Sequence, residues 1–115
     1  MPRATVTRDV LHVHLSLREK VSGLLRDLEV PRASVVSAEV VEDGLAAARG
    51  VRAPGLALPG VTKVGTWRSR AGRQFVAVRR GVPALRLELR DAAFSSAVVS
   101  LPDAERVARE LAARP

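Results

Sequence analysis

A succession of four short strand-like segments in the C-terminal half of the chain constrains the fold more than any other feature of the sequence. In Ala84–Arg90, Leu85, Leu87 and Leu89 alternate with charged residues, and this period of two is typical of a β-strand with one buried face. The other three segments are Val61–Arg68, Arg73–Arg79 and Phe94–Leu101. Because only short turns separate them, we expect an antiparallel meander, and hence a barrel or a sandwich.

Shorter segments nearer the N-terminus also predict regular structure. Leu11–Leu15 alternates with period two, Leu28–Val30 precedes a proline, and Ser34–Glu42 is rich in valine, so each of them predicts a strand. Leu17–Leu25 has the apolar spacing of a short helical turn.

The segment Gly44–Gly60 is rich in glycine and proline, with aliphatic residues between them. Because proline and glycine interrupt regular structure, we expect a long loop packed on the domain, with one helical turn at Leu45–Arg49. Its aliphatic residues Val51, Leu56 and Leu58 then cover the barrel, form a dimer contact or line a ligand groove.

The end of the chain predicts an amphipathic helix. Pro102 suits the first helical position, and Asp103 and Glu105 lie near the positive end of the helix dipole. One apolar stripe follows at helical spacing: Ala104, Val107, Ala108, Leu111 and Ala112. We expect this stripe to lie against the β-strands.

Several short pieces between Val30 and Leu111 suggest a lineage. They are Val30-Pro31 with Ser34-Val35 and Val40, Arg49–Gly55, Pro59-Gly60, Phe75, Arg79–Gly81 with Pro83-Ala84, and Phe94-Ser95. Together they resemble small actinobacterial proteins of the pleckstrin-homology-like type, a bacterial family of uncharacterised function. The resemblance implies one mainly β domain over residues 1–115, a bent antiparallel barrel of about seven strands closed by the C-terminal helix. It also implies a binding or scaffold domain that often self-associates, and it assigns no functional residue.

Length and composition narrow the class further. A chain of 115 residues is the size of one domain, and the absence of cysteine excludes disulfides, thiolate metal sites and a cysteine nucleophile. No stretch is apolar for long enough to cross a bilayer, so we expect no transmembrane segment. The first residues lack the apolar core of a secretion signal, and we therefore expect a cytoplasmic protein.

The net charge of +7 is concentrated in one segment, since Gly44–Leu87 holds nine basic residues and no acidic residue. Its exposed candidates for binding an anionic surface, nucleic acid or phospholipid headgroups, are Lys63, Arg68, Arg70, Arg73, Arg79 and Arg80. Trp67 lies among them and suits stacking on a base, although a strand-borne Trp also suits a core or an interface. Seventeen of the nineteen basic residues are Arg, a bias that GC-rich coding also produces. The sequence leaves both explanations open.

His12 and His14 are the only histidines, and residues two apart on a strand point to the same side. That spacing occurs in metal sites, but such a site needs a third ligand and nothing in the sequence nominates one. We therefore expect two solvated histidines, with no metal and no cofactor.

The other chemical groups do not assemble into a catalytic motif. Ser95, Ser96 and Ser100 lack a nucleophile-elbow motif, and the neighbouring Glu42 and Asp43 suit a solvated turn. The glycines form neither a phosphate-binding loop nor a dinucleotide fingerprint. We expect a non-enzymatic module that binds a protein partner or a second copy of itself. The alternative is a binder of anionic surfaces through the six basic residues, and a metal-dependent enzyme using the two histidines ranks well below both.

Overall fold

The structure, a computed structural model, describes residues 2–48, 50–58 and 60–112, which form two β-sheets and three α-helices. The smaller sheet has the order β1-β2-β3, with strands β1 (Arg3–Val6), β2 (Val10–His14) and β3 (Leu28–Pro31). The larger sheet has the order β4-β8-β9-β7-β6-β5, with strands β4 (Val35–Val41), β5 (Val51–Leu58), β6 (Thr62–Ser69), β7 (Gly72–Arg79), β8 (Ala84–Leu89) and β9 (Ser96–Ser100). The helices are α1 (Leu17–Gly23), α2 (Gly44–Ala47) and α3 (Ala104–Ala112), and a 3₁₀ turn spans Arg32–Ser34.

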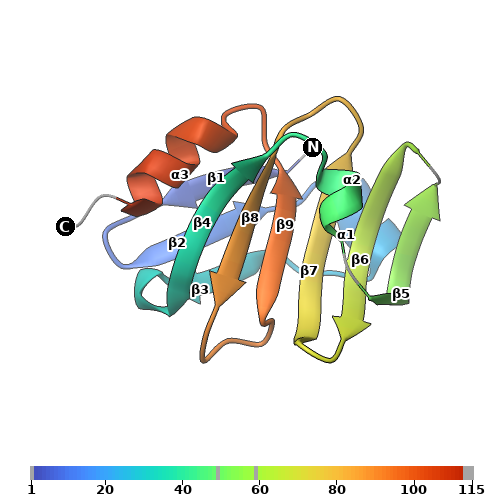
Figure 1. Cartoon of the computed structure of the whole chain (residues 1–115), viewed down its shortest axis with the longest axis horizontal. Coiled ribbons are helices and arrows are strands. Elements are labelled where there is room, and N and C mark those ends of the chain that lie inside the picture. The colour runs from blue at the N-terminus through green and yellow to red at the C-terminus, as the bar shows by residue number, and fades with distance from the viewer. Residues whose placement is uncertain (1, 49, 59, 113–115) are drawn as a thin grey trace.

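The elements form layers around the larger sheet (Figure 1). The smaller sheet lies behind the β4 side of the larger one, α1 packs behind β5 and β6, and α3 packs against β4, β1 and β8. Side chains from the two sheets and α3 meet between these layers in the main hydrophobic core, in which Leu11, Phe75 and Leu87 are almost fully buried. On the opposite face, α2 packs on β7, β8 and β9 above a second, smaller cluster that includes Trp67 and Val98.

Most predicted elements are present within a few residues of their expected bounds. Strands β2, β3, β4, β6, β7, β8 and β9 are confirmed, as are the helical turn that became α1 and the C-terminal helix α3. In α3 most of the predicted apolar stripe points inward: Ala104 and Val107 are buried, and Ala108 and Leu111 pack on the core, whereas Ala112 is exposed. The N-terminus of α1 is fixed by side-chain hydrogen bonds, because Ser16 and Glu19 form a reciprocal capping box at its first turn.

The predicted mainly β architecture with a C-terminal helix is confirmed, but the sheets are open and do not close into the predicted bent antiparallel barrel. The chain also departs from a meander at β9, which lies between β7 and β8 and runs parallel to β7, pairing Gln74 with Ser96. β9 is apolar on both faces: Ala97 belongs to the main core and Val98 to the smaller cluster. Burial on both faces favours an interior position in the sheet, which β9 could not have at the edge of a meander.

The prediction of a loop over Gly44–Gly60 was half wrong. It contains the expected helical turn, α2, but then forms β5, the edge strand beside β6. A Cβ added at Gly55 would lie 2.5 Å from the carbonyl oxygen of Val64, so glycine lets the two backbones approach. The register with β6 shifts between Arg52 and Gly55, as expected of a bulged edge strand. Strand β1 was not predicted at all.

No helix within residues 2–48, 50–58 and 60–112 is long and apolar enough to span a bilayer.

Candidate functional site

The outer face of the smaller sheet carries the two histidines. Leu11 and Val13 are fully buried in the main core, so the alternation of β2 turns His12 and His14 to the opposite, outer face. The register of β2 with β3 pairs His12 with Glu29 and Val13 with Leu28. Asp27 directly precedes β3, and this register brings it beside His14.

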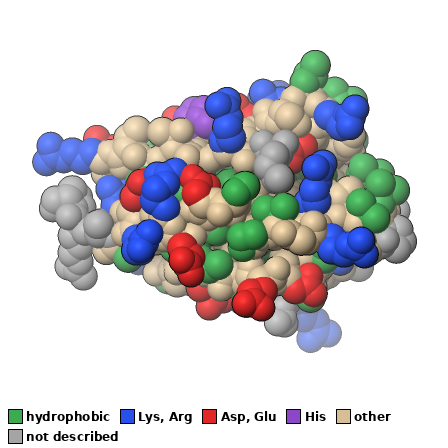
Figure 2. Space-filling model, turned by 90° about the horizontal axis from the view of Figure 1, so that it is seen from above, with side chains coloured by type: hydrophobic (Ala, Val, Ile, Leu, Met, Phe, Trp, Pro, Cys, Tyr) green, Lys and Arg blue, Asp and Glu red, His purple; other side chains and the backbone are tan. Residues whose placement is uncertain are grey.

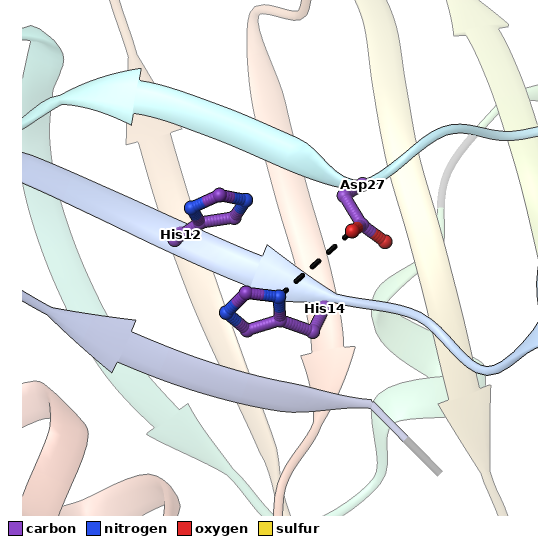
Figure 3. A group of neighbouring side chains, drawn as sticks. All are labelled: His12, His14 and Asp27. Carbon is purple, nitrogen blue, oxygen red and sulfur yellow. Dashed lines mark ion pairs between the residues drawn. The ribbon is translucent and has the colours of Figure 1, made fainter.

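Figure 3 shows the resulting group of His12, His14 and Asp27. The two imidazole rings stack with their centroids 4.2 Å apart and their planes 15° from parallel. His14 Nδ1 lies 3.8 Å from Asp27 Oδ2, and one nitrogen or oxygen atom from each of the three side chains lies within 4.8 Å of the others. The three side chains are about one-third exposed, so solvent reaches the group.

Asp27 is held in place from two sides. Its Oδ1 accepts a hydrogen bond from the backbone N–H of Leu15 at 2.8 Å and lies 3.4 Å from Lys20 Nζ. The hydrogen bond from Leu15 is the main cause that lowers the pKa of Asp27. Burial acts in the opposite direction and raises the pKa in part, and the nearby charge of Lys20 lowers it. The carboxylate is therefore ionised at neutral pH, with Oδ2 turned toward His14.

Sequence reasoning missed Asp27 because α1 separates it from the histidines along the chain. The expectation of no metal site rested on the lack of a third ligand, and the structure places a candidate for that ligand next to His14. The one signal in the sequence is that Asp27 and Glu29 lie at or beside the strand that follows the histidine strand. If the two strands pair, one of these acidic residues can lie opposite a histidine. The sequence alone does not say which.

The six predicted anion-binding residues do not form one patch. β6 and β7 are antiparallel, with Arg68 opposite Arg73 at the hairpin end and Lys63 opposite Val78 at the other end. Arg70 lies in the hairpin turn, Arg79 lies opposite Thr62 at the end of β7, and Arg80 directly follows it. The six therefore divide into two groups separated by about 17 Å along the strands.

Several of these cations also have partners within the protein. Lys63 Nζ donates to the Leu45 carbonyl oxygen at 2.9 Å, and Arg73 donates to the Ala93 carbonyl oxygen at 2.8 and 3.2 Å. The open groove that Lys63 and Arg80 line also contains Glu42 and Asp43, which offset its positive charge. Trp67 is only 4% exposed and belongs to the smaller hydrophobic cluster, so it offers no stacking surface.

The serines considered as nucleophiles have structural partners. Ser100 is fully buried, and its hydroxyl accepts a hydrogen bond from the Arg79 backbone N–H at 2.9 Å. The Ser95 hydroxyl donates to the Arg73 carbonyl oxygen at 3.1 Å. Ser96 lines a polar groove with Arg86 and Glu88, which are paired with each other.

A third feature is an apolar surface at the β5 end of the molecule. Leu17 and Val21 lie four residues apart on α1, and Leu24 directly follows the helix; the three are 77%, 66% and 70% exposed. Leu58 and Val61, on either side of the turn between β5 and β6, are about half exposed. We call these five residues the apolar end. Figure 2 shows hydrophobic side chains exposed on the right-hand side, where β5 and β6 lie in Figure 1.

The packing of α1 on β5 and β6 brings the helix to the same end of the molecule as Leu58 and Val61. α1 packs on β5 and β6, and its Arg18, Glu19 and Ser22 line a small cavity of about 60 Å³ together with Leu56 and Thr62. Leu58 lies two residues beyond Leu56 on the same side of β5, and Val61 directly precedes Thr62. Of the predicted loop residues, Leu56 therefore covers the sheet and Leu58 is open to a contact, while the Val51 side chain lies outside what the structure describes.

Comparison of the chain with models of protein families, with curated proteins and with solved structures finds no match.

Proposed function

We propose that this protein is a non-enzymatic binding domain that associates with a second copy of itself through the apolar end. The observation that carries the proposal is the stripe of Leu17 and Val21 on one face of α1, with Leu24 directly after the helix, three large aliphatic side chains that are each about two-thirds or more exposed. Scattered exposed aliphatic residues are ordinary, but a helical stripe next to two further ones forms a patch, and such patches mark interaction sites.

The distribution of exposed aliphatic residues favours a second copy as the partner. Among the side chains described, six large aliphatic ones are exposed, and five of them belong to the apolar end. The sixth, Val36, stands alone on β4. A head-to-tail contact needs a second apolar surface elsewhere on the chain, whereas a two-fold contact buries the same patch on both copies and closes at the dimer.

The charges beside the stripe are compatible with such a contact. Arg18, Glu19 and Lys20 follow Leu17 directly, so residues of both signs flank the stripe on α1. In a two-fold pairing of antiparallel helices, the acidic residue of one copy can approach the basic residues of the other.

The helix face, rather than the β5 edge, supplies the contact. β5 is the outer strand of the larger sheet, and its backbone edge is open to pairing in principle. However, its sequence contains Pro54, which has no N–H to donate, and its register shifts between Arg52 and Gly55. Both features oppose the addition of another strand.

The test compares the wild-type chain with Val21→Asp. The wild-type chain is expected to show twice its 12.3 kDa mass by light scattering over a micromolar concentration series. Val21→Asp places a charge in the centre of the patch on both copies, which should weaken association by at least about a hundredfold. The matched control is Val36→Asp, an equally exposed valine at the far side of the sheet, and it should leave the mass unchanged.

A wild-type mass of 12.3 kDa at all concentrations, or equal effects of the two substitutions, would overturn the proposal. Vesicles that contain anionic phospholipid, and a short DNA duplex at low salt, test the alternative of an anionic partner. Binding to either that survives Val21→Asp but falls after charge reversal at Arg68 and Arg70 would support that alternative instead.

The relation to pleckstrin-homology-like proteins is part of the proposal and rests on the sequence resemblance. A C-terminal helix packed against a mainly β body agrees with it in outline. The open sheets and the parallel pairing of β7 with β9 are not features of such a barrel.

A further inference from the structure

The side chains of His12, His14 and Asp27 are a set that suits a transition metal. Two imidazole nitrogens and one carboxylate oxygen are ligands that zinc and its first-row neighbours accept, with water completing the coordination. Magnesium and calcium prefer all-oxygen sets, so they fit this group poorly. The group differs from a chance acidic cluster because two of its three members are imidazole side chains.

The backbone brings these three side chains together rather than leaving them to meet by chance. Strand β2 fixes both histidines on one face, since Leu11 before them and Val13 between them are buried in the core. The Asp27 carboxylate is oriented by the Leu15 N–H at 2.8 Å, which occupies Oδ1 and leaves Oδ2 toward His14. Hydrogen bonds of this kind to a ligand carboxylate are what orient it in metal sites.

The group needs only local movement to close around a metal. In a tetrahedral zinc site with bonds of about 2.0–2.2 Å, the ligand atoms lie roughly 3.3–3.5 Å apart. Here they lie within 4.8 Å, and the imidazole rings stack at 4.2 Å instead of converging on one point. Both histidines are about one-third exposed, so a turn of each ring displaces water and not core side chains.

Lys20 is the group that opposes a cation here. Its Nζ lies 3.4 Å from Asp27 Oδ1, and a metal on the same carboxylate places two positive charges close together. Lys20 is on α1 with a flexible, 40% exposed side chain, so it can swing toward solvent when a metal binds. Removal of the Lys20 charge should therefore strengthen metal binding, an effect that is not expected if Asp27 only forms a surface ion pair.

We propose that His12, His14 and Asp27 form a binding site for a divalent first-row transition metal, with zinc as the probe ion. Glu29 lies beside His12, with 3.9 Å between Oε2 and Nε2, and helps to orient that ring. The site is independent of the dimer contact proposed above, because none of its ligands belongs to the apolar end.

Calorimetric titration of the metal-free protein with zinc at neutral pH tests the site. The expected result is one zinc per chain in the wild type, and no saturable binding of magnesium. His12→Gln, His14→Gln and Asp27→Asn should each weaken zinc binding by more than about tenfold. Asp27→Asn keeps an oxygen that can accept the hydrogen bond from Leu15. Weaker zinc binding by this variant therefore reflects the lost negative charge and not a disturbed strand.

Two further variants make the test specific. Asp91→Asn removes one carboxylate outside the group, at a residue with φ of 54° that asparagine tolerates, and should leave zinc affinity unchanged. Lys20→Gln should tighten zinc binding by roughly threefold to tenfold, because it removes the neighbouring positive charge.

Titration with cobalt(II) supplies a readout of geometry, since visible absorption is strong for a tetrahedral site and weak for an octahedral one. The proposal is overturned if the wild type binds zinc no more tightly than a His12→Gln, His14→Gln double variant. It is also overturned if Asp27→Asn binds zinc as the wild type does, because the third ligand is then absent.

Discussion

At Gly23, near the end of α1, a single missing side chain determines how closely the helix approaches the larger sheet. A Cβ added there would lie 2.6 Å from Val64 Cγ1 and 3.1 Å from the Val64 carbonyl carbon and oxygen. Contacts this short force the helix and β6 apart or turn the valine from its rotamer. Glycine has a low helix propensity, and in the structure this one is the point of contact between α1 and β6.

We therefore expect Gly23→Ala to lower the free energy of unfolding by about 1–3 kcal/mol, despite the better helix propensity of alanine. Chemical denaturation followed by circular dichroism measures the change. Ser22→Ala, one residue earlier on the same helix, is the control and should change stability by less than about 0.5 kcal/mol. Equal stability of Gly23→Ala and the wild type would show that α1 can shift away from β6 without cost.

The histidines show at the same scale what a residue's neighbours add. The spacing of His12 and His14 predicted only that both point to one side. Asp27 completes the group because of a register between β2 and β3 that no property of the individual residues encodes.

At the scale of the element, α1 is a short helix with strong signals at both ends and an outward apolar face. The capping box of Ser16 and Glu19 begins it, and Leu24 ends it in a left-handed conformation with φ of 51° and ψ of 46°. That conformation is unfavourable for a leucine and common for a glycine. Leu24 is also 70% exposed, so packing within the chain does not explain its identity.

Leu24→Gly separates the two roles of this residue. It should raise the stability of the isolated chain by about 0.5–1 kcal/mol, since glycine adopts the left-handed conformation without strain. It should at the same time weaken self-association, because one side chain of the apolar end is lost. Thermal denaturation at low concentration and light scattering at high concentration measure the two effects. A variant that is destabilised and still dimeric would contradict both expectations.

β5 illustrates how far an element can depart from local preference. Its glycines and proline predicted a loop, and in isolation they disfavour a strand. Beside β6, the same residues become useful: Gly55 permits close approach to Val64, and the bulge shields the free edge. Packing on α1 and β6 outweighs the unfavourable propensity.

At the scale of the whole molecule, the chain forms two hydrophobic clusters on opposite faces of one sheet. Trp67 reports on the smaller cluster, and β9 contributes to both, through Ala97 to one and Val98 to the other. Because one strand joins the two clusters, we expect them to unfold together, as a single domain over residues 1–115 should.

Thermal or urea unfolding followed in parallel by Trp67 fluorescence and far-ultraviolet circular dichroism tests this expectation. The two transitions should coincide in midpoint and in steepness. If the fluorescence transition precedes the other by several degrees, the smaller cluster and α2 unfold separately from the main core.

The same scale explains how folding divides the described cations of the basic segment and gives some of them acidic neighbours. The residues between Gly44 and Leu87 include no acid, yet folding brings Glu42 and Asp43 beside Lys63 and Arg80. Each of the strands β6 and β7 has one cation near each of its ends, so the cations form two separate groups. A charge count over a segment does not account for neighbours contributed by other segments.

Taken by itself, the sequence determined the local elements: the alternating strands, the capped first turn of α1 and the inward stripe of α3. These depend on periodicity and on hydrogen bonds between residues three or four apart, which are encoded over a few positions. The tertiary structure alone decided the open sheets, the parallel pairing of β7 with β9 and the strand at β5. It alone also brought Asp27 to the histidines and left Leu17, Val21 and Leu24 facing outward. Those outcomes depend on which distant surfaces are buried together, and the free energy of that choice is shared by the whole core.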